Sequence, residues 1–373
     1  MDLTAEQLKR SVPSSDRSQD EVDDLPRAIS RERFIFHGNA GEYFRIWIVN
    51  LSLTILTLGI YSAWAKVRRN RYIYGNMELA NSRFDYLARP RQILKGRLFA
   101  LTLLLVFIAA QAFFTFGWLV LTLLLAVTVP WLLVRSRMFN MRYTAFRNIR
   151  FSFKPAYAHS YKVIFGYGAL SLITLGLAAP YAHFKRNQLI VDNTCFGNLG
   201  FRLDALGKHF YLAYILGAVL GSVLLIPLNA LEGTTSADSI NNSLPRLPVS
   251  VFLSFAAVFL LYYVVGQFIN AYILRLTTNG THIAAQDAKS AHSLGCDWTL
   301  TGMLGIYLSN AVAIALSLGL LVPWAKMRIL RYQLNNTWLD VAGTLDDVIA
   351  GQGDDVSSIG EEIGDVFDVD IGL

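Results

Sequence analysis

The sequence has little charge and almost no cysteine. Only 16% of its 373 residues are charged, while 54% are hydrophobic and the mean hydropathy is +0.39. An average globular domain is about 25% charged. Two cysteines, Cys195 and Cys296, suggest neither a disulfide framework nor a metal site. The composition is unlike that of an ordinary globular domain and is typical of a membrane protein.

Signatures of catalysis are also lacking. The sequence contains no Gly-x-Ser-x-Gly, His-Glu-x-x-His or Gly-Lys-Ser/Thr pattern. Its six histidines are scattered, and even His282 and His292, ten positions apart, are a weak metal signal. We therefore expect no enzyme activity, no metal site and no cofactor.

Three long stretches contain no Asp, Glu, Lys, Arg or His: 98–134, 210–231 and 247–274. Runs longer than about 18 residues of this kind predict membrane spans. They indicate two apolar helical hairpins, at 98–134 and 209–274. The polar residues 1–32 lack the apolar core of a signal peptide and are expected to form a disordered tail.

The charges are segregated along the chain. Residues 33–331 hold 28 Lys/Arg against nine Asp/Glu, whereas the residues after Arg331 hold ten Asp/Glu and no cation. We expect a membrane domain at 33–340 and a disordered acidic tail at 341–373. A basic membrane domain favours the bilayer and its anionic phospholipids as partners. Nucleic acid is a weaker reading, because the cations lie beside apolar helices.

One segment recurs three times. Residues 34–84 align with 151–201 at an offset of 117, and the core returns at an offset of 260 in 298–340. The recurring core reads "TLGIYSAWAKVRRNRYIYGN", "TLGLAAPYAHFKRNQLIVDN" and "SLGLLVPWAKMRILRYQLNN". These matches predict three copies of one unit.

Each unit shows the same succession of patterns. A short aromatic alternation ("FIFHG", "FSFK" and "WTLTG") predicts a strand, and an apolar helix of about 20 residues follows it. A break with hinge residues comes next, and then a basic helix ending at an asparagine. The hinge candidates are Gly59, Gly176, Pro180, Gly319 and Pro323. The predicted fold is an all-α multi-pass membrane protein in which three such units alternate with the two hairpins.

The basic helices are the candidate binding sites. Trp64, Arg68 and Arg71 fall at i, i+4 and i+7 and therefore share one helix face. Tryptophan favours the headgroup level, and a cation just beyond it suits a phosphate. We name this feature the basic collar and assign it lipid or anion binding. Its predicted residues are Trp64, Lys66, Arg68, Arg71, Lys185, Arg186, Trp324, Lys326, Arg328 and Arg331.

The membrane topology has two readings. Seven simple spans would place the cationic stretch 66–97 outside if the N-terminus is inside, against the positive-inside tendency. If only the hairpins cross and the three units enter and leave on the cytoplasmic side, every Lys and Arg of the membrane domain except Arg246 can lie inside. We favour the second reading and keep seven spans as the alternative.

The motifs resemble a known family. "FIFHGNAGEYF", "LTLGIYSAWAKVRRNRYIYGN", "NSRFDY", "IRFSF" and "VPWAKMRILRY" are similar to the YjgN-like family of uncharacterised bacterial inner-membrane proteins, over roughly residues 33–340. The resemblance implies a multi-pass protein of the bacterial inner membrane and supplies no activity or site residues. The middle unit departs from it, with Tyr181 and His183 at the Trp and Lys positions.

Three functions compete at this stage. The first is a non-enzymatic membrane protein whose basic collars contact anionic lipid headgroups. The second is a transporter or channel for a small anionic solute, which would use the broken helices of the units. The third, a membrane enzyme acting on a lipid-like substrate, is weakest because no catalytic constellation is evident.

Overall fold

The computed structural model describes residues 29–113, 117–241, 247–285 and 292–342. Within these ranges, a succession of strands, two helical stretches and a returning strand occurs five times. The first segment consists of β1 (Ile29–Arg33), β2 (Ile35–Phe36), α1 (Ala40–Leu56), α2 (Ser62–Gly75) and β3 (Met77–Leu79). The second consists of β4 (Ser82–Tyr86), α3 (Pro90–Phe113), α4 (Gly117–Tyr143) and β5 (Thr144–Phe146).

The remaining three segments follow the same order. The third consists of β6 (Ile149–Phe153), α5 (Tyr157–Tyr161), the π-helical η2 (Lys162–Tyr167), α6 (Gly168–Ile173), α7 (Ala179–Asp192) and β7 (Thr194–Phe196). The fourth consists of β8 (Leu199–Leu203), α8 (Gly207–Asn241), α9 (Leu247–Asn279) and β9 (Thr281–Ala285). The fifth consists of β10 (His292–Cys296), α10 (Leu300–Leu316), α11 (Val322–Asn335) and β11 (Thr337–Ala342).

The strands form one antiparallel sheet that closes on itself. Its order is β1-β11-β10-β9-β8-β7-β6-β5-β4-β3-β2. β1 pairs with β11, from Ile29 opposite Ala342 to Arg33 opposite Trp338, and β2 pairs with β3. Only Phe34 separates β1 from β2, and its amide donates to the carbonyl of Thr337 at 3.0 Å. The two edges therefore meet, and we call this sheet the strand ring.

The strand ring overturns the predicted all-α fold. Its strands are two to six residues long, and the residues that pair across it can lie at opposite ends of the chain. The alternations "FIFHG" and "FSFK" correctly predicted strands, β2 and β6, but local patterns do not show that all the strands join in one sheet. The third copy of the aromatic alternation was also misread, because "WTLTG" leads into α10 while the strand β10 ends before it, at Cys296.

The interior of the ring is filled by hydrophobic side chains. Phe84 stacks on Phe146 at 4.7 Å between ring centroids, and Phe151 packs against Phe196 at 4.8 Å. Residues from strands around the whole ring complete this cluster: Leu79, Leu199, Ile283, Leu339 and Val341. Because the cluster draws on strands from all sides of a closed sheet, it forms the core inside the strand ring.

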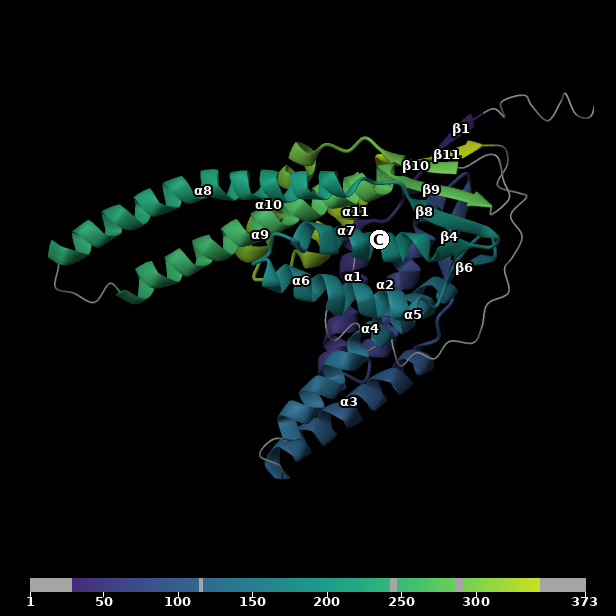
Figure 1. The fold of residues 1–373 in the computed structure, drawn as a ribbon, viewed down its shortest axis with the longest axis horizontal. Helices are drawn as coiled ribbons and strands as arrows, with labels where there is room; N and C mark the ends of the chain where they lie inside the picture. Colours follow the sequence, from purple (N-terminus) through teal and green to yellow (C-terminus); the bar gives the residue numbers. More distant parts are fainter. Residues whose placement is uncertain (1–28, 114–116, 242–246, 286–291, 343–373) are drawn as a thin grey trace, which may run out of the picture.

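All five helical segments project from the same rim of the ring. Neighbouring strands are antiparallel, so each pair of helices leaves and rejoins at one rim. At the other rim, two-residue turns connect the first four segments, as at Ala80–Asn81 (φ 46° and 56°) and Arg147–Asn148 (φ 49° and 64°). In Figure 1 the strands gather at one end of the molecule, and the helical hairpins α8–α9 and α3–α4 extend farthest away from them.

The helices also pack around the molecule in sequence. α2 packs against α3, α4 against α5, α7 against α8, and α9 against α10. α11 then packs against α1, so the last segment meets the first. Phe36, Tyr43 and Met327 form the buried core of this junction.

Candidate functional site

The three basic helices, α2, α7 and α11, begin at three similar turns. Thr57, Thr174 and Ser317 each place a side-chain oxygen where the backbone N–H four residues later donates to it, at 2.9, 3.0 and 3.0 Å. The predicted hinge glycines lie within these turns, with φ of 93° for Gly59 and 90° for both Gly176 and Gly319. Only glycine adopts such φ values without strain. Pro180 and Pro323 stand in the first turn of α7 and α11, where the missing N–H costs no helix bond.

The same helices end alike. Asn76, Asn193 and Asn336 are their C-cap residues. Each donates from Nδ2 to the carbonyl oxygen four residues earlier, in every case at 2.7 Å. A common start and a common end hold each basic helix at the same position between its apolar helix and the strand ring.

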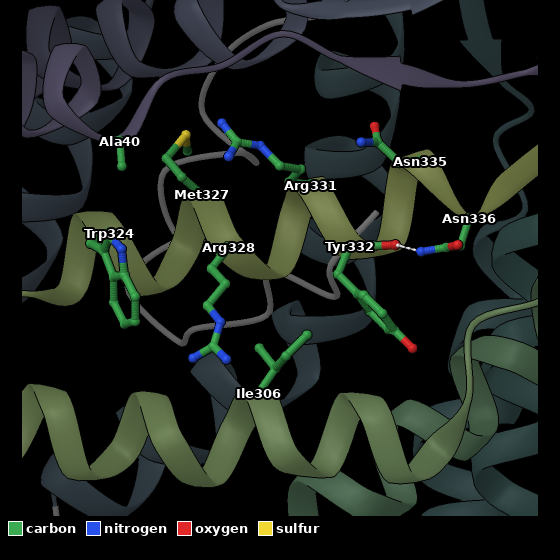
Figure 2. Close-up of a pocket in the computed structure, with 9 residues that line it drawn as sticks. All are labelled: Ala40, Ile306, Trp324, Met327, Arg328, Arg331, Tyr332, Asn335 and Asn336. Carbon is green, nitrogen blue, oxygen red and sulfur yellow. Dashed lines mark hydrogen bonds between the residues drawn. The ribbon is translucent and has the colours of Figure 1, made fainter.

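A cavity of about 400 Å³ lies beside α11, where the fifth segment meets the first. Figure 2 shows its lining: Ala40, Ile306, Trp324, Met327, Arg328, Arg331, Tyr332, Asn335 and Asn336. Most of these residues come from α11, while Ile306 belongs to α10 and Ala40 begins α1. The cavity therefore combines two predicted arginines and a predicted tryptophan of one basic collar.

Arg328 and Arg331 leave α11 in different directions. Arg328 lies over the ring of Trp324, 5.3 Å from its centroid, and donates to Ser309 Oγ at 2.6 Å and Asn310 Oδ1 at 3.2 Å. Arg331 points the other way, as Figure 2 shows, and donates to the carbonyl oxygen of Gly38 at 2.7 Å. The structure thus brings Trp324 and Arg328 together as predicted, but Arg331 borders the cavity from the opposite side. Lys326, also predicted, is half-buried on α11.

The residues of the first collar also have different surroundings. Arg71 donates to the carbonyl oxygens of Tyr86 and Ala88 at 3.4 and 3.2 Å, which attaches α2 to the neighbouring segment. Trp64 stacks on Tyr61 with 6.2 Å between centroids. Lys66 is buried, so its ammonium does not face solvent as a collar residue should. Arg68 is exposed on the surface of α2.

The middle collar is the weakest. Lys185 donates to Gln188 Oε1 at 2.9 Å and lies over the rings of Tyr181 and Phe184 at 5.6 and 5.1 Å. Its neighbour Arg186 is exposed. Lys185 is therefore engaged within its own helix, in keeping with the departure of this unit from the sequence motif.

Sequence reasoning missed the hairpin tips. Leu58, Leu175 and Leu318 each precede a hinge glycine, and each is 94% exposed. Their φ values of 50–51° lie in the left-handed region, so the turn holds each side chain outward at a strained backbone position. Each stands in the recurring "LG" dipeptide, and this recurrence could have pointed to the three leucines from the sequence.

Sequence reasoning also missed two buried asparagines inside the apolar helices. Asn50 in α1 and Asn310 in α10 are among the buried polar residues of the chain. Each donates from Nδ2 to a carbonyl oxygen of the basic helix beside it, Asn50 to Ala65 at 3.4 Å and Asn310 to Ala325 at 3.3 Å. They stand 260 positions apart, at the same offset as the two motifs.

The described residues offer little reactive chemistry. Within them, no group of three or more His, Cys, Asp or Glu is placed to hold a metal ion. Cys195 and Cys296 are buried free thiols. Burial raises the pKa of both, that of Cys296 to about 11, so at neutral pH neither is the thiolate that a nucleophile requires.

The structure defines a class of protein: a small closed strand ring that carries exposed apolar helical hairpins on one rim. In the described part of the chain, two helical stretches are long and apolar enough to cross a membrane, Thr122–Tyr143 and Gly207–Ile226. The chain belongs to a family of bacterial proteins of unknown function, DUF898, which matches residues 31–366. The match extends past the predicted boundary at 340 into the acidic tail.

Relatives with names are inner-membrane proteins. The chain is 26% identical to the inner membrane protein YjgN of Salmonella typhimurium over 370 residues, which cover 84% of this chain and 89% of the relative. It is 35% identical to inner membrane protein YjgN of Escherichia coli over 149 residues, 38% of this chain and 36% of that one. These matches confirm the predicted resemblance and support a bacterial inner-membrane location. No solved structure matches the chain.

Proposed function

We propose that this chain is a non-enzymatic, multi-pass protein of the inner membrane whose basic collars bind the headgroups of anionic phospholipids. The two long hairpins cross the bilayer, the three short ones enter and leave on one side, and the strand ring lies at the cytoplasmic face. The observation that carries the proposal is the exposure of Leu58, Leu175 and Leu318 at the ends of hairpins whose second helices bear the collars.

Helix length supports this division of the hairpins. The hydrocarbon core of a bilayer is about 30 Å thick. At about 1.5 Å per residue, the 35 and 33 residues of α8 and α9 reach about 50 Å, and the 24 and 27 of α3 and α4 about 36–40 Å. The 17 and 14 residues of α1 and α2 reach only about 21–26 Å. The long hairpins can therefore cross and return, while a short hairpin can only enter.

Charge supports the cytoplasmic side for the ring. All five segments leave one rim, so the ring and the ends of every segment share a side of the membrane. The stretches 66–97 and 135–157 hold nine and six Lys/Arg, whereas 231–248, which runs from the end of α8 to the start of α9, holds one. Cations near membrane spans favour the cytoplasmic side. With an even number of crossings, the chain also enters and leaves the membrane on the same side.

The main alternative is transport of a small anionic solute along the broken helices of the units. Such a path could not follow the axis of the strand ring without moving the phenylalanines that fill it. It would have to run between helices, past the collars. We keep this function as the second candidate, to be tested by anion flux in liposomes that contain the purified protein.

Lipid retention tests the main proposal. Wild type, the double variant Arg68→Gln with Arg71→Gln, and the control Arg150→Gln are purified in one detergent and examined by native mass spectrometry for phosphatidylglycerol and cardiolipin. Arg150 is an exposed arginine of strand β6, away from the collars. The double variant should retain fewer anionic lipids, and the control should match wild type. Equal retention in all three proteins would contradict headgroup binding.

A further inference from the structure

The hairpins α1–α2 and α10–α11 are built alike, but the arginine at one matching position has different hydrogen-bond partners in the two. Their buried asparagines, Asn50 and Asn310, make the same bond to the basic helix, at 3.4 and 3.3 Å. Arg68 and Arg328 stand at matching positions, three residues after the carbonyl that each asparagine contacts. The two hairpins can therefore be compared atom by atom.

In α10–α11, the asparagine and the arginine are joined. Arg328 Nη1 donates to Asn310 Oδ1 at 3.2 Å and to Ser309 Oγ at 2.6 Å. These two acceptors lie on the apolar helix, so they hold the guanidinium across the hairpin. Arg328 therefore serves to fasten α11 to α10, and much of its donor capacity is used within the protein.

In α1–α2, the matching atoms are apart. Asn50 Oδ1 is buried and accepts no hydrogen bond from the residues that the structure describes. Arg68 is exposed, and within the same residues no hydrogen bond or ion pair holds it. A buried polar atom without a partner is rare in a native protein and calls for a cause.

The cause can be read from one position. Val49 stands where α10 has Ser309, and a valine side chain cannot accept a hydrogen bond. Arg68 thus lacks one of the two acceptors that hold Arg328. The middle unit does not reproduce the arrangement, since Tyr167 replaces the asparagine and Lys185 is bonded to Gln188.

We propose that Arg68 is the residue that binds the phosphate group of an anionic lipid headgroup, because the apolar helix beside it does not hold its guanidinium as α10 holds that of Arg328. This assignment rests on the headgroup binding proposed above and names the cation that performs it. A guanidinium presents planar paired donors that match phosphate oxygens. Trp64, one helical turn before Arg68, suits the headgroup level. Arg328, by contrast, is a residue that fastens its hairpin.

Single and exchanged substitutions test the assignment. Full-length Arg68→Gln, Arg328→Gln, Val49→Ser and Ser309→Val are compared with wild type and with Arg150→Gln. Each is placed in nanodiscs of phosphatidylcholine with a stated fraction of phosphatidylglycerol, and bound phosphatidylglycerol is counted by native mass spectrometry after release. Arg68→Gln should bind phosphatidylglycerol about fivefold more weakly, the effect of one cation near an anionic group. Arg328→Gln should bind it as wild type does.

The variants Val49→Ser and Ser309→Val keep both arginines and change only the hydrogen-bond acceptors beside them. They therefore test whether binding depends on an arginine free of partners rather than on its charge alone. Val49→Ser keeps Arg68 but gives it a second acceptor, so it should weaken binding in the same direction. Ser309→Val should release Arg328 and strengthen binding. Equal losses in Arg68→Gln and Arg328→Gln would overturn this assignment while leaving headgroup binding intact. No loss in either would overturn both. Val49→Ser binding as wild type does would also contradict the proposal.

The source of the phosphate is distinguished by competition. Inorganic phosphate and glycerol 1-phosphate are added to wild-type nanodiscs at millimolar concentration. Retention of phosphatidylglycerol in their presence supports a lipid headgroup as the ligand. If either soluble anion displaces phosphatidylglycerol from wild type but not from Arg68→Gln, the site binds a soluble phosphate. That result would overturn the lipid assignment.

Discussion

Arg331 donates from Nη2 to the carbonyl oxygen of Gly38 at 2.7 Å, across 293 positions of the chain. The bond attaches the last basic helix to the loop that precedes the first apolar helix. A second bond reinforces it, since the amide of Phe36 donates to Asn335 Oδ1 at 2.9 Å. α11 therefore closes the molecule at the point where β1 and β11 close the strand ring.

The phenylalanine core should determine the stability of the strand ring. Phe146 is buried and contacts both Phe84 and Phe196, at 4.7 and 6.0 Å between centroids. Phe146→Ala should lower the free energy of unfolding by about 3–5 kcal/mol, because it leaves a cavity that the closed ring cannot fill. Phe146→Leu, which keeps most of the volume, should cost markedly less. Thermal unfolding in detergent measures both, and equal midpoints would contradict a packed ring interior.

The pairing of β10 with β11 should weaken at acidic pH. His292 accepts the amide of Ala342 at Nδ1, 3.0 Å away, and burial lowers its pKa in the folded protein. The unfolded chain therefore binds the proton more readily, so this contribution is fully present above the ordinary pKa of about 6.5 and is lost as the pH falls through the folded value.

His292→Asn isolates this effect. The amide oxygen of asparagine can still accept from Ala342 but does not titrate in this range. The unfolding midpoint of wild type should fall relative to that of the variant as the pH drops below about 6.5. Parallel pH profiles for the two proteins would exclude His292 as the cause.

The hairpin tips should lie within the bilayer. Spin labels at Leu175→Cys and at Arg150→Cys compare a tip with the strand ring, and the native thiols Cys195 and Cys296 are buried. A label at position 175 should be relaxed by oxygen, which concentrates in the hydrocarbon region, and protected from a water-soluble nickel complex. The label at 150 should show the reverse. Similar accessibilities at both positions would place the short hairpins outside the membrane.

The sequence predicted local structure far better than it predicted how the segments assemble. The "TLG" and "SLG" breaks and the terminal asparagines have local causes, a positive φ and a side-chain cap, and the structure has turns and caps at those residues. The strand ring could not be predicted in this way. Ile29 pairs with Ala342 across 313 positions of the chain, and a three-residue strand such as Met77–Leu79 is too short to show an alternation.

In the candidate site, too, the sequence predicted local contacts but not contacts between segments. The spacing of Trp324 and Arg328 was enough to bring them together, whereas the turn of Arg331 toward Gly38 depends on the contact between α11 and α1. The difference between Arg68 and Arg328 was present in the sequence as Val49 against Ser309. Its meaning required the geometry of the hairpin, because only the structure shows which acceptors face each guanidinium.

The acidic tail should not be needed for insertion. Its composition cannot bury a core, and exposed ion pairs with the collars would contribute only about 0–1 kcal/mol each. A chain that ends at Ala342 keeps β11 and every described bond that closes the ring. It should accumulate in the membrane fraction at a level near wild type. Failure to accumulate would mean that the tail, part of which lies within the family match, contributes to the fold.

The topology has the sharpest test. Ser243 lies between the long helices α8 and α9, and Asn81 lies in the turn between β3 and β4 at the far rim of the strand ring. If the long hairpins cross the membrane and the ring is cytoplasmic, a cysteine at 243 should react with an impermeant thiol reagent in intact spheroplasts. A cysteine at 81 should react only after lysis, and the buried native thiols should contribute little background. Seven simple spans with the N-terminus inside would instead expose position 81 to the periplasm. Labelling at 81 in intact spheroplasts would therefore overturn the proposed arrangement, and labelling at both 81 and 243 would favour the seven-span alternative.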